Sequence, residues 1–281
     1  MFQPDTLDGQ RILITGGGTG LGRAMAERMG ALGAEIAVLG RRTAPLEETV
    51  AAIEKAGGKA AWASADVRDP EQIAAAVDRV EEALGPLTGL VNNAAGNFLA
   101  CTEDLSANAF NAVVQIVLNG TFHTTQELGR RWIERGDGGT VLSIVTTYAW
   151  TGSPFVVPSA CAKAGVLALT RSLAVEWATY GIRSNAIAPG PFPTEGAFSR
   201  LMPEPMVEEA RRAVPMKRFG EPRELADLAV YLMSPMAAFL NGECVVIDGG
   251  EWLHQGQEFS RFTDLPREQV KGMLEQLKPK K

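Results

Sequence analysis

The sequence has few of the residues that build metal sites, disulfide frameworks or hydrolytic triads. Only two histidines are present among 281 residues, His123 and His254. The three cysteines, Cys101, Cys161 and Cys244, are isolated and show no CxxC or Cys/His spacing. The sequence therefore offers few candidate residues for a zinc site, a disulfide framework or the triad of a Ser–His–Asp hydrolase, and we expect no bound metal.

The sequence also lacks an excess of positive charge and long apolar runs. Its 27 basic and 33 acidic residues give a formal net charge of −6, which argues against nucleic acid or an anionic membrane as the main partner. No stretch approaches the roughly 20 apolar residues that span a bilayer. Residues 1–10 have neither the basic start nor the apolar run of a signal peptide. We therefore expect a soluble, cytoplasmic protein.

Short apolar runs alternate with longer amphipathic segments along the chain. The apolar runs that we interpret as strands are residues 11–15, 35–39, 60–65, 87–92, 140–146, 183–188 and 244–247. The segments that we interpret as helices are residues 21–32, 45–56, 107–118, 121–135, 160–180 and 222–233, with a further helix that opens at Pro70. This alternation predicts an α/β fold: a doubly wound parallel sheet of about seven strands, in one domain over residues 1–281.

Residues 189–215 interrupt this alternation, because they contain six prolines. They follow the sixth predicted strand, at the edge where doubly wound folds bind their ligands. We therefore interpret residues 190–215 as a flap over a binding site. The alternative is an ordinary irregular insertion on the surface.

A glycine-rich turn joins the first predicted strand to the first predicted helix. Its sequence is TGGGTGLG at residues 15–22. Glycines let a backbone turn tightly and approach a pyrophosphate, while the start of a helix offers free N–H groups. This pattern predicts a Rossmann-type dinucleotide site with contacts from Thr15, Gly16, Gly18, Thr19, Gly20 and Leu21.

The end of the second predicted strand distinguishes the two nicotinamide dinucleotides. An enzyme that uses NAD places an acidic residue there, to bind the ribose hydroxyls. Here the sequence is Gly40, Arg41, Arg42 and Thr43, so two guanidinium groups are available to a 2′-phosphate. We predict NADP(H), with Arg41 as the phosphate ligand; a pair of solvated arginines is the alternative. Asp66, after the third predicted strand, is positioned to accept a hydrogen bond from the adenine amino group.

Further motifs extend the pattern over nearly the whole chain. They are NNAAG at 92–96, LNGTF at 118–122, Lys163 in a long predicted helix, APG at 188–190 and DGG at 248–250. Together with the glycine-rich turn, they resemble the short-chain dehydrogenase/reductase superfamily. The resemblance implies the Rossmann fold, a nicotinamide cofactor and a homotetramer.

The sequence departs from that superfamily at its usual catalytic tyrosine. The superfamily carries Tyr-x-x-x-Lys on the long helix, with a serine upstream. Here Ser159 stands at the tyrosine position and Thr146 at the serine position, while Tyr148 follows the fifth predicted strand. This arrangement resembles the NADPH-dependent 2,4-dienoyl-CoA reductases of the mitochondrial type. The matching segments are NAAGNF at 93–98, Tyr148, FVVPSA at 155–160, Gly190-Pro191 and GAFSR at 196–200.

That resemblance implies a role for each matching residue. Tyr148 and Asn97 donate hydrogen bonds to the thioester carbonyl of the substrate, and Lys163 holds the nicotinamide ribose. Ser159 lies beside them as a polar wall or proton relay, and Asn119 serves a water relay or satisfies the backbone of a kinked helix. The implied cofactor contacts further along the chain are Asp66, Val67, Asn93, Pro189, Gly190, Phe192 and Thr194. The implied acyl-CoA contacts are Arg68, Phe98, Ser106 and Arg200.

The implied activity is the NADPH-dependent reduction of 2,4-dienoyl-CoA to 3-enoyl-CoA in the β-oxidation of unsaturated fatty acids. A hydride that adds at C5 of the conjugated thioester sends negative charge to the thioester oxygen, where Tyr148 and Asn97 would stabilise it. Two alternatives remain. One is the reduction of a 3-ketoacyl thioester or another carbonyl, and the other is a catalytically silent NADP-binding regulator.

Overall fold

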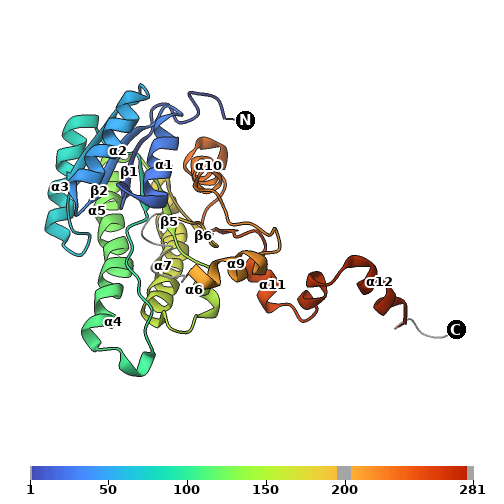
Figure 1. Cartoon of the computed structure of the whole chain (residues 1–281). Helices are drawn as coiled ribbons and strands as arrows, with labels where there is room; N and C mark the ends of the chain where they lie inside the picture. Colours follow the sequence, from blue (N-terminus) through green and yellow to red (C-terminus); the bar gives the residue numbers. More distant parts are fainter. Residues whose placement is uncertain (1, 195–203, 277–281) are drawn as a thin grey trace.

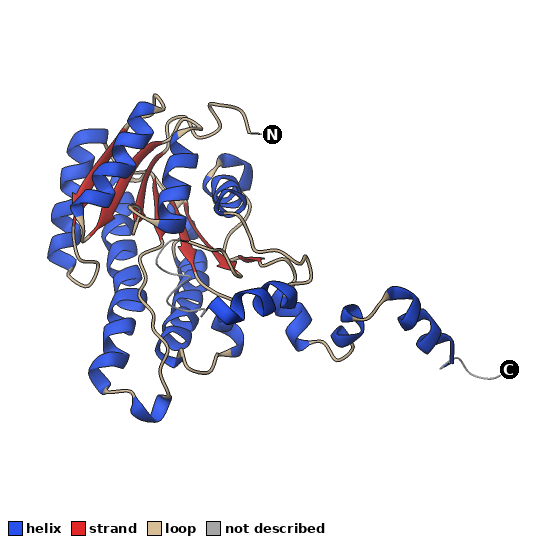
Figure 2. Cartoon of the chain, viewed as in Figure 1, coloured by secondary structure: helices blue, strands red, loops and turns tan. Residues whose placement is uncertain are grey.

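The computed structural model of the chain describes residues 2–194 and 204–276. Parallel strands form a seven-stranded sheet in the order β3-β2-β1-β4-β5-β6-β7. Figures 1 and 2 show this sheet packed among the helices. The strands are β1 (Arg11–Thr15), β2 (Glu35–Gly40), β3 (Ala60–Ser64), β4 (Gly89–Asn92), β5 (Gly139–Ile144), β6 (Ile182–Pro189) and β7 (Cys244–Ile247). The predicted fold class, a doubly wound parallel sheet of the Rossmann type, is confirmed.

Helices cover both faces of this sheet, because its central strands are apolar on both sides. Ile12 and Ile14 of β1 point to one face and Leu13 to the other, and all three are fully buried. The first face is covered by α1 (Gly20–Gly30), α2 (Thr43–Lys55) and α10 (Pro222–Met233). The second face is covered by α3 (Pro70–Leu84), α5 (Gly120–Arg135) and α7 (Val157–Glu176).

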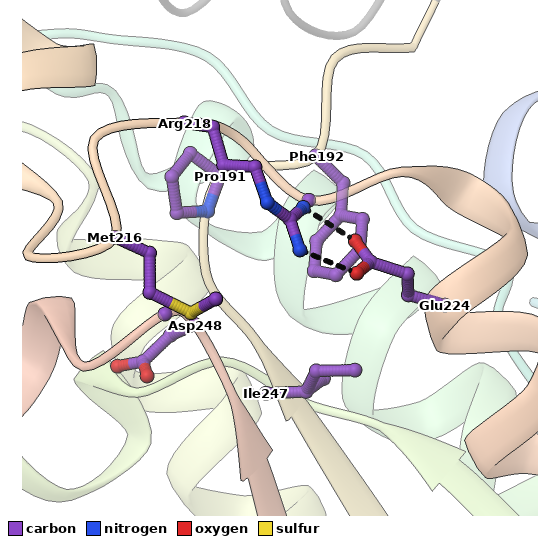
Figure 3. Close-up of a pocket in the computed structure, with 9 residues that line it drawn as sticks. Pro191, Phe192, Met216, Arg218, Glu224, Ile247 and Asp248 are labelled. Carbon is purple, nitrogen blue, oxygen red and sulfur yellow. Dashed lines mark hydrogen bonds and ion pairs between the residues drawn. The ribbon is translucent and has the colours of Figure 1, made fainter.

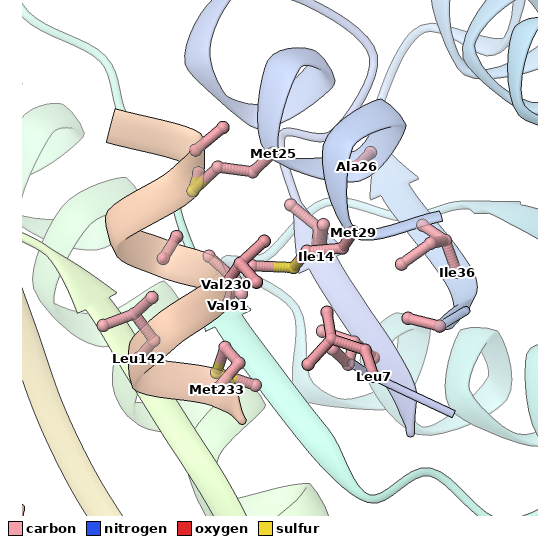
Figure 4. Packing of buried hydrophobic residues seen from close by; sticks show 14 of the residues in the cluster. Leu7, Ile14, Met25, Ala26, Met29, Ile36, Val91, Leu142, Val230 and Met233 are labelled. Carbon is pink, nitrogen blue, oxygen red and sulfur yellow. The ribbon is translucent and has the colours of Figure 1, made fainter. Parts of the chain in front are cut away.

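The packing of α1 against α10 shows how the first face is filled. Met25 and Met29 of α1 meet Val230 and Met233 of α10 above the sheet, and all four side chains are almost completely buried (Figure 4). Burying a side chain of this size stabilises the fold by roughly 1.5–3 kcal/mol. This packing fixes α1, whose first turn borders the glycine-rich loop.

The strand order reverses between β1 and β4, since the chain runs outward through β2 and β3 before it returns to β4. In open α/β sheets, ligands bind in the crevice at such a reversal, beyond the carboxyl ends of the strands. The glycine-rich turn follows β1 at this point. All seven strands are parallel, so the residues that follow each of them gather at the same edge.

Several predicted boundaries need correction. The predicted helix 160–180 is α7, which begins at Val157, with Pro158 in its first turn, and ends at Glu176. A separate 3₁₀ turn, η3 (Ala178–Tyr180), follows it. The predicted helices 107–118 and 121–135 are one continuous path through α4 (Ala107–Val114), the π-helical turn η2 (Gln115–Asn119) and α5. The predicted strands 87–92 and 140–146 are shorter, as β4 and β5.

Several elements were not predicted, and most of them have six residues or fewer, too few to show a period. They are η1 (Thr102–Asp104), α6 (Tyr148–Thr151), α9 (Glu204–Ala213), η4 (Pro235–Ala237), α11 (Glu251–Gly256), η5 (Ser260–Asp264) and α12 (Arg267–Gln276). Helix α9 lies inside the predicted flap, so residues 204–213 are not irregular. From α11 to α12 the chain extends away from the sheet (Figure 1). Among the helices described, none combines the length and apolar character needed to cross a bilayer.

Candidate active site

The glycine-rich loop needs glycine for two reasons: two of its residues have positive φ angles, and another packs against neighbouring atoms too closely for a side chain. Gly16 and Gly20 have φ angles of +65° and +54°. A Cβ on Gly22 would lie 2.3 Å from the Gly16 carbonyl oxygen and 2.5 Å from Nδ2 of Asn93. A Cβ on Gly20 would lie 3.4 Å from Thr194 Cβ, so the loop passes close to the segment that follows β6. This close packing brings the start of α1 to the strand edge.

Thr15 and Asn93 join the loop to the end of β4. Thr15 Oγ1 accepts the backbone N–H groups of Asn93 and Ala94, each at 3.0 Å. Asn93 Nδ2 donates to the carbonyl oxygens of Thr15 and Gly16 at 3.1 and 3.2 Å. Both predicted cofactor residues therefore use their side chains to hold the loop. Thr19 is the N-cap residue of α1 but makes no side-chain capping hydrogen bond among the described residues, so the first N–H groups of the helix can bind a phosphate.

Beyond the ends of β2 and β3 lies a charged group made of Arg41, Asp66 and Arg68. Arg68 Nη2 lies 2.6 Å from Asp66 Oδ2, and Arg68 Nε lies 2.9 Å from Asp66 Oδ1. The hydrogen bond from Arg68 lowers the pKa of Asp66, and the nearby charge of Arg41 lowers it further. Arg41 is exposed at the start of α2. Asp66, which was predicted to bind adenine, therefore forms an ion pair with Arg68, which was predicted to bind the acyl-CoA.

Val67, the next predicted cofactor contact, is buried against the start of α5. A Cβ on Gly120 would lie 2.6 Å from Val67 Cγ2. The Val67 carbonyl oxygen lies 3.3 Å from Nδ1 of His123. The side chain of Val67 therefore belongs to the core, and the residue presents backbone rather than side chain to a ligand.

Lys163 lies deep in the molecule, on α7 beneath the end of β5. Its side chain is buried, and Nζ donates to the carbonyl oxygen of Ile144. Burial lowers the pKa of Lys163 to about 8. A buried ammonium with a lowered pKa at the strand edge is a group that can hold a ribose hydroxyl and support proton movement.

Tyr148 and Ser159 come together above Lys163. Tyr148 begins α6 and Ser159 lies in the first turn of α7, and their hydroxyl oxygens are 3.0 Å apart. Ser159 is buried, whereas Tyr148 is half-buried. A phenol on the solvent side of a buried hydroxyl can turn its O–H toward a bound ligand. Ser159 lies one turn before Lys163 on α7, and its hydrogen bond brings the Tyr148 hydroxyl of α6 to that part of the helix.

Asn97 and Asn119, the other two predicted catalytic residues, are both half-buried. Asn97 Oδ1 accepts the N–H of Phe98 at 2.9 Å, so the amide nitrogen of the side chain is oriented away from that bond. Asn119 ends the π-helical turn η2. A π turn inside a longer helix displaces the residues around it and is frequent at functional sites. The two roles predicted for Asn119, a water relay or a partner for the backbone of a kinked helix, stay predictions.

The segment after β6 crosses the site toward the predicted flap. Gly190 donates its N–H to Ile247 at 3.0 Å, and a Cβ on Gly190 would lie 2.6 Å from Asp248 Cβ. Phe192 is buried in the core against Gly220, so only its backbone faces the site. Pro189 and Thr194 are half-buried. Together these residues form a backbone wall beside the glycine-rich loop.

A cavity of about 130 Å³ lies behind this wall, between the end of β7 and the end of the flap (Figure 3). Arg218 and Glu224 form a bidentate ion pair across it, with distances of 2.6 and 2.8 Å. Arg218 lowers the pKa of Glu224 to about 2. Sequence reasoning missed both residues, although Arg218 begins the segment RFGEP at 218–222 and Glu224 follows it by two residues. The cavity adjoins Pro191 and Phe192 but is not lined by Tyr148 or Lys163.

The structure describes three of the four predicted acyl-CoA contacts, Arg68, Phe98 and Ser106. Phe98 is exposed, and Ser106 Oγ accepts the N–H of Ala109 at 3.1 Å as the N-cap of α4. The side chain of Ser106 therefore has a structural role. Arg200 lies outside the described residues. Glu251, at the start of α11, is half-buried rather than solvated, and burial raises the pKa of its carboxyl group.

Thr146, noted in the sequence only as a departure from the superfamily, also belongs to this edge. Its Oγ1 is buried and has no hydrogen-bond partner among residues 2–194 and 204–276. Buried hydroxyls normally have a partner.

A family model described as enoyl-(acyl carrier protein) reductase matches residues 16–251.

Curated relatives match most of the chain. An uncharacterized oxidoreductase of Caenorhabditis elegans is 48% identical over 92% of this chain and 85% of its own. A protein of Bacillus subtilis named "probable 2,4-dienoyl-CoA reductase [(2E)-enoyl-CoA-producing]" is 44% identical over 88% of this chain and 98% of its own. The peroxisomal 2,4-dienoyl-CoA reductase [(3E)-enoyl-CoA-producing] of Arabidopsis thaliana is 38% identical over 96% and 91%.

Solved structures match the fold. A short chain dehydrogenase of Bacillus anthracis is 44% identical, with a TM-score of 0.81 over 88% of this chain and 98% of the other. A gluconate 5-dehydrogenase of Burkholderia cenocepacia, in complex with NADP and tartrate, is 31% identical, with a TM-score of 0.82 over 88% and 97%. The chain is therefore an oxidoreductase that belongs to the short-chain dehydrogenase/reductase superfamily.

Proposed function

We propose that this chain is an NADPH-dependent 2,4-dienoyl-CoA reductase that converts 2,4-dienoyl-CoA thioesters to 3-enoyl-CoA in the β-oxidation of unsaturated fatty acids. The observation that carries the proposal is the 3.0 Å contact between Tyr148 and Ser159 near the buried Lys163. The phenol stands on a different element from the lysine helix, so it is displaced from the place where a ketone reductase of the superfamily holds its acid. Relatives named 2,4-dienoyl-CoA reductase support the same reaction.

The glycine-rich loop fits a dinucleotide. A Cβ on Gly16 would lie 3.0 Å from Asn93 Nδ2 and 3.1 Å from Ala94 Cα, and the N–H groups at the start of α1 have no side-chain cap among the described residues. A pyrophosphate needs both the close backbone approach and the free donors. When bound, the cofactor supplies the hydride. Lys163 would hold its nicotinamide ribose, and the backbone of Pro189–Phe192 would face the nicotinamide.

The substrate's negative charge would be met by neutral donors. A hydride received at C5 of the dienoyl thioester moves charge through the conjugated system to the thioester oxygen. Tyr148 Oη–H and the side-chain amide of Asn97 donate to that oxygen, and Ser159 orients the phenol through their shared hydrogen bond. Such donors act mainly in the transition state, where the charge is largest. A proton then reaches C2 and leaves the double bond between C3 and C4.

NADPH absorbance with 2,4-hexadienoyl-CoA and, separately, acetoacetyl-CoA tests this function. We expect rapid oxidation of NADPH with the dienoyl substrate and slow oxidation with the ketone. Turnover of acetoacetyl-CoA alone would show a carbonyl reductase. Tight NADPH binding with turnover of neither would show a silent NADP-binding regulator.

We infer a preference for NADPH over NADH from Arg41, which is exposed beside Asp66 at the end of β2. Arg41→Ser should lower the ratio of kcat/KM for NADPH to that for NADH by about 10- to 100-fold, the value of a charge-assisted hydrogen bond. Arg42→Ser is the matched control, because Arg42 is equally exposed but occupies the N-cap of α2. A larger effect at Arg42 would move the phosphate site to that residue.

The remaining predictions stay proposals. Arg68 and Phe98 would contact the acyl-CoA, and the segment at 190–215 would cover the site as a flap. Exposed apolar side chains near the edge strand β7, including Met236 and Phe239, favour self-association as a homotetramer. The cytoplasmic location stays a prediction, and the Arabidopsis relative is named peroxisomal.

A further inference from the structure

Two loops of the candidate site contain exposed apolar side chains, and each loop lies beside a residue proposed to donate to the thioester oxygen, Asn97 or Tyr148. The first loop follows β4, where Asn97 is succeeded by Phe98 and Leu99. The second loop joins α6 to α7, between Tyr148 and Ser159, and contains Phe155. The exposed fractions of Phe98, Leu99 and Phe155 are 37, 50 and 56%. Large apolar side chains gathered beside a polar site are unusual on a surface and mark a contact region.

The two loops are joined to each other and to the candidate active site. The N–H of Ala100 donates to the carbonyl oxygen of Phe155 at 3.0 Å. The base of the second loop is closed by the hydrogen bond between Tyr148 and Ser159. Because of these two bonds, Leu99 and Phe155 lie within one residue of the point where the loops meet. The apolar side chains are therefore held at a fixed place relative to the phenol.

Phe155 has a backbone conformation that is unfavourable for an aromatic residue. Its φ angle is +63°, in the left-handed region that aromatic residues rarely adopt. More than half of its surface is exposed, so it gains little from burial within this chain. Strained backbone of this kind persists where the surrounding structure imposes it, and it concentrates at binding sites. The strain and the exposure together indicate a contact that the described residues of this chain do not supply.

We propose that Leu99 and Phe155 form an apolar wall that binds the acyl tail of the substrate, beyond its conjugated double bonds. The identity of the head group rests on the proposed function. The tail is a chain of methylene groups, which only apolar surface can recognise. The wall is continuous with the loops that carry Asn97 and Tyr148, so a thioester held by those donors has its tail beside the wall. Longer acyl chains should therefore bind more tightly.

Calorimetric titration with hexanoyl-CoA and decanoyl-CoA tests the wall without any chemical turnover. We expect the unmodified chain to bind decanoyl-CoA at least about tenfold more tightly, since each fully buried methylene contributes a factor of roughly four. Leu99→Ala and Phe155→Gly should each lower that ratio about threefold or more. Phe155→Gly adopts the φ of +63° without strain, so its melting temperature should not fall.

Phe239→Ala is the matched control. Phe239 is fully exposed, but it lies near the amino end of β6, whereas the candidate site lies beyond the carboxyl ends of the strands. It should leave the ratio unchanged. An unmodified chain without a chain-length preference, or Leu99→Ala and Phe155→Gly variants that keep it, would overturn the proposal. If these variants instead changed the mass by light scattering and kept the preference, the apolar side chains would form a contact with a second copy. Turnover of 2,4-hexadienoyl-CoA tests the proposed function separately.

Discussion

Replacing Tyr148 by phenylalanine is expected to lower kcat with 2,4-hexadienoyl-CoA by about 10²–10³, the usual cost of one lost oxyanion donor. The ring and its packing on α6 are kept, and only the hydroxyl that lies 3.0 Å from Ser159 is removed. The KM for the thioester should change much less, because the donor acts mainly on the charge that develops in the transition state. Steady-state kinetics at saturating NADPH measures both constants.

Ser159→Ala is the matched control for Tyr148→Phe, since it removes the other hydroxyl of the same hydrogen bond. Ser159 is buried and orients the phenol rather than contacting the thioester, so its loss should cost less than about tenfold in kcat. If Ser159→Ala costs more than Tyr148→Phe, the acid stands at the superfamily's usual position, and the assignment of Tyr148 is wrong.

Lys163→Met is expected to abolish most activity, with a loss of about 10²–10³ in kcat/KM for NADPH. Methionine fills a similar volume and removes a buried charge whose pKa burial lowers to about 8. The fold should therefore survive, and the melting temperature should not decrease. Fluorescence titration with NADPH would show weakened binding. Unchanged NADPH binding and unchanged kcat would contradict a role for Lys163 in the site.

The pH dependence of the unmodified enzyme follows from the same lysine. In the proposed mechanism the protonated form of Lys163 holds the ribose, and this form is populated below the pKa of about 8. The kcat/KM for NADPH, which reports groups of the free enzyme, should therefore fall as the pH rises through about 8. Lys163→Met should lose this decrease while keeping its low residual activity.

The seven strands could be predicted because buried parallel strands are near-continuous apolar runs, such as RILIT in β1. Helix ends were less predictable. The helix through Lys163 begins at Val157, before a proline that fits the first turn, and the pattern did not show this start. Helix α6, with Tyr148 at its first residue, is one turn long and has no period to recognise. Its placement depends on tertiary contacts.

The candidate site could be predicted only as a set of residues, not as a set of contacts. The sequence predicts Thr15, Asn93 and Asp66 as cofactor contacts at strand ends, but it does not show which groups of the protein their side chains bind. In the structure Thr15 and Asn93 fix the loop, and Asp66 pairs with Arg68. Short polar side chains at strand ends find partners through packing, which no spacing rule encodes. Arg218 and Glu224 are long charged residues outside the strands, and they were missed because their pairing likewise arises only in the folded chain.

Product analysis after reduction with NADPH that carries deuterium as its transferable hydride distinguishes reduction of the conjugated double bonds from reduction of a carbonyl. With 2,4-hexadienoyl-CoA as substrate, we expect a 3-enoyl-CoA with deuterium at C5 and a new solvent-derived proton at C2, both visible by NMR. A 2-enoyl-CoA product would contradict proton delivery at C2. Deuterium retained in the cofactor with the dienoyl-CoA, together with its transfer to the carbonyl carbon of acetoacetyl-CoA, would contradict the proposed function itself.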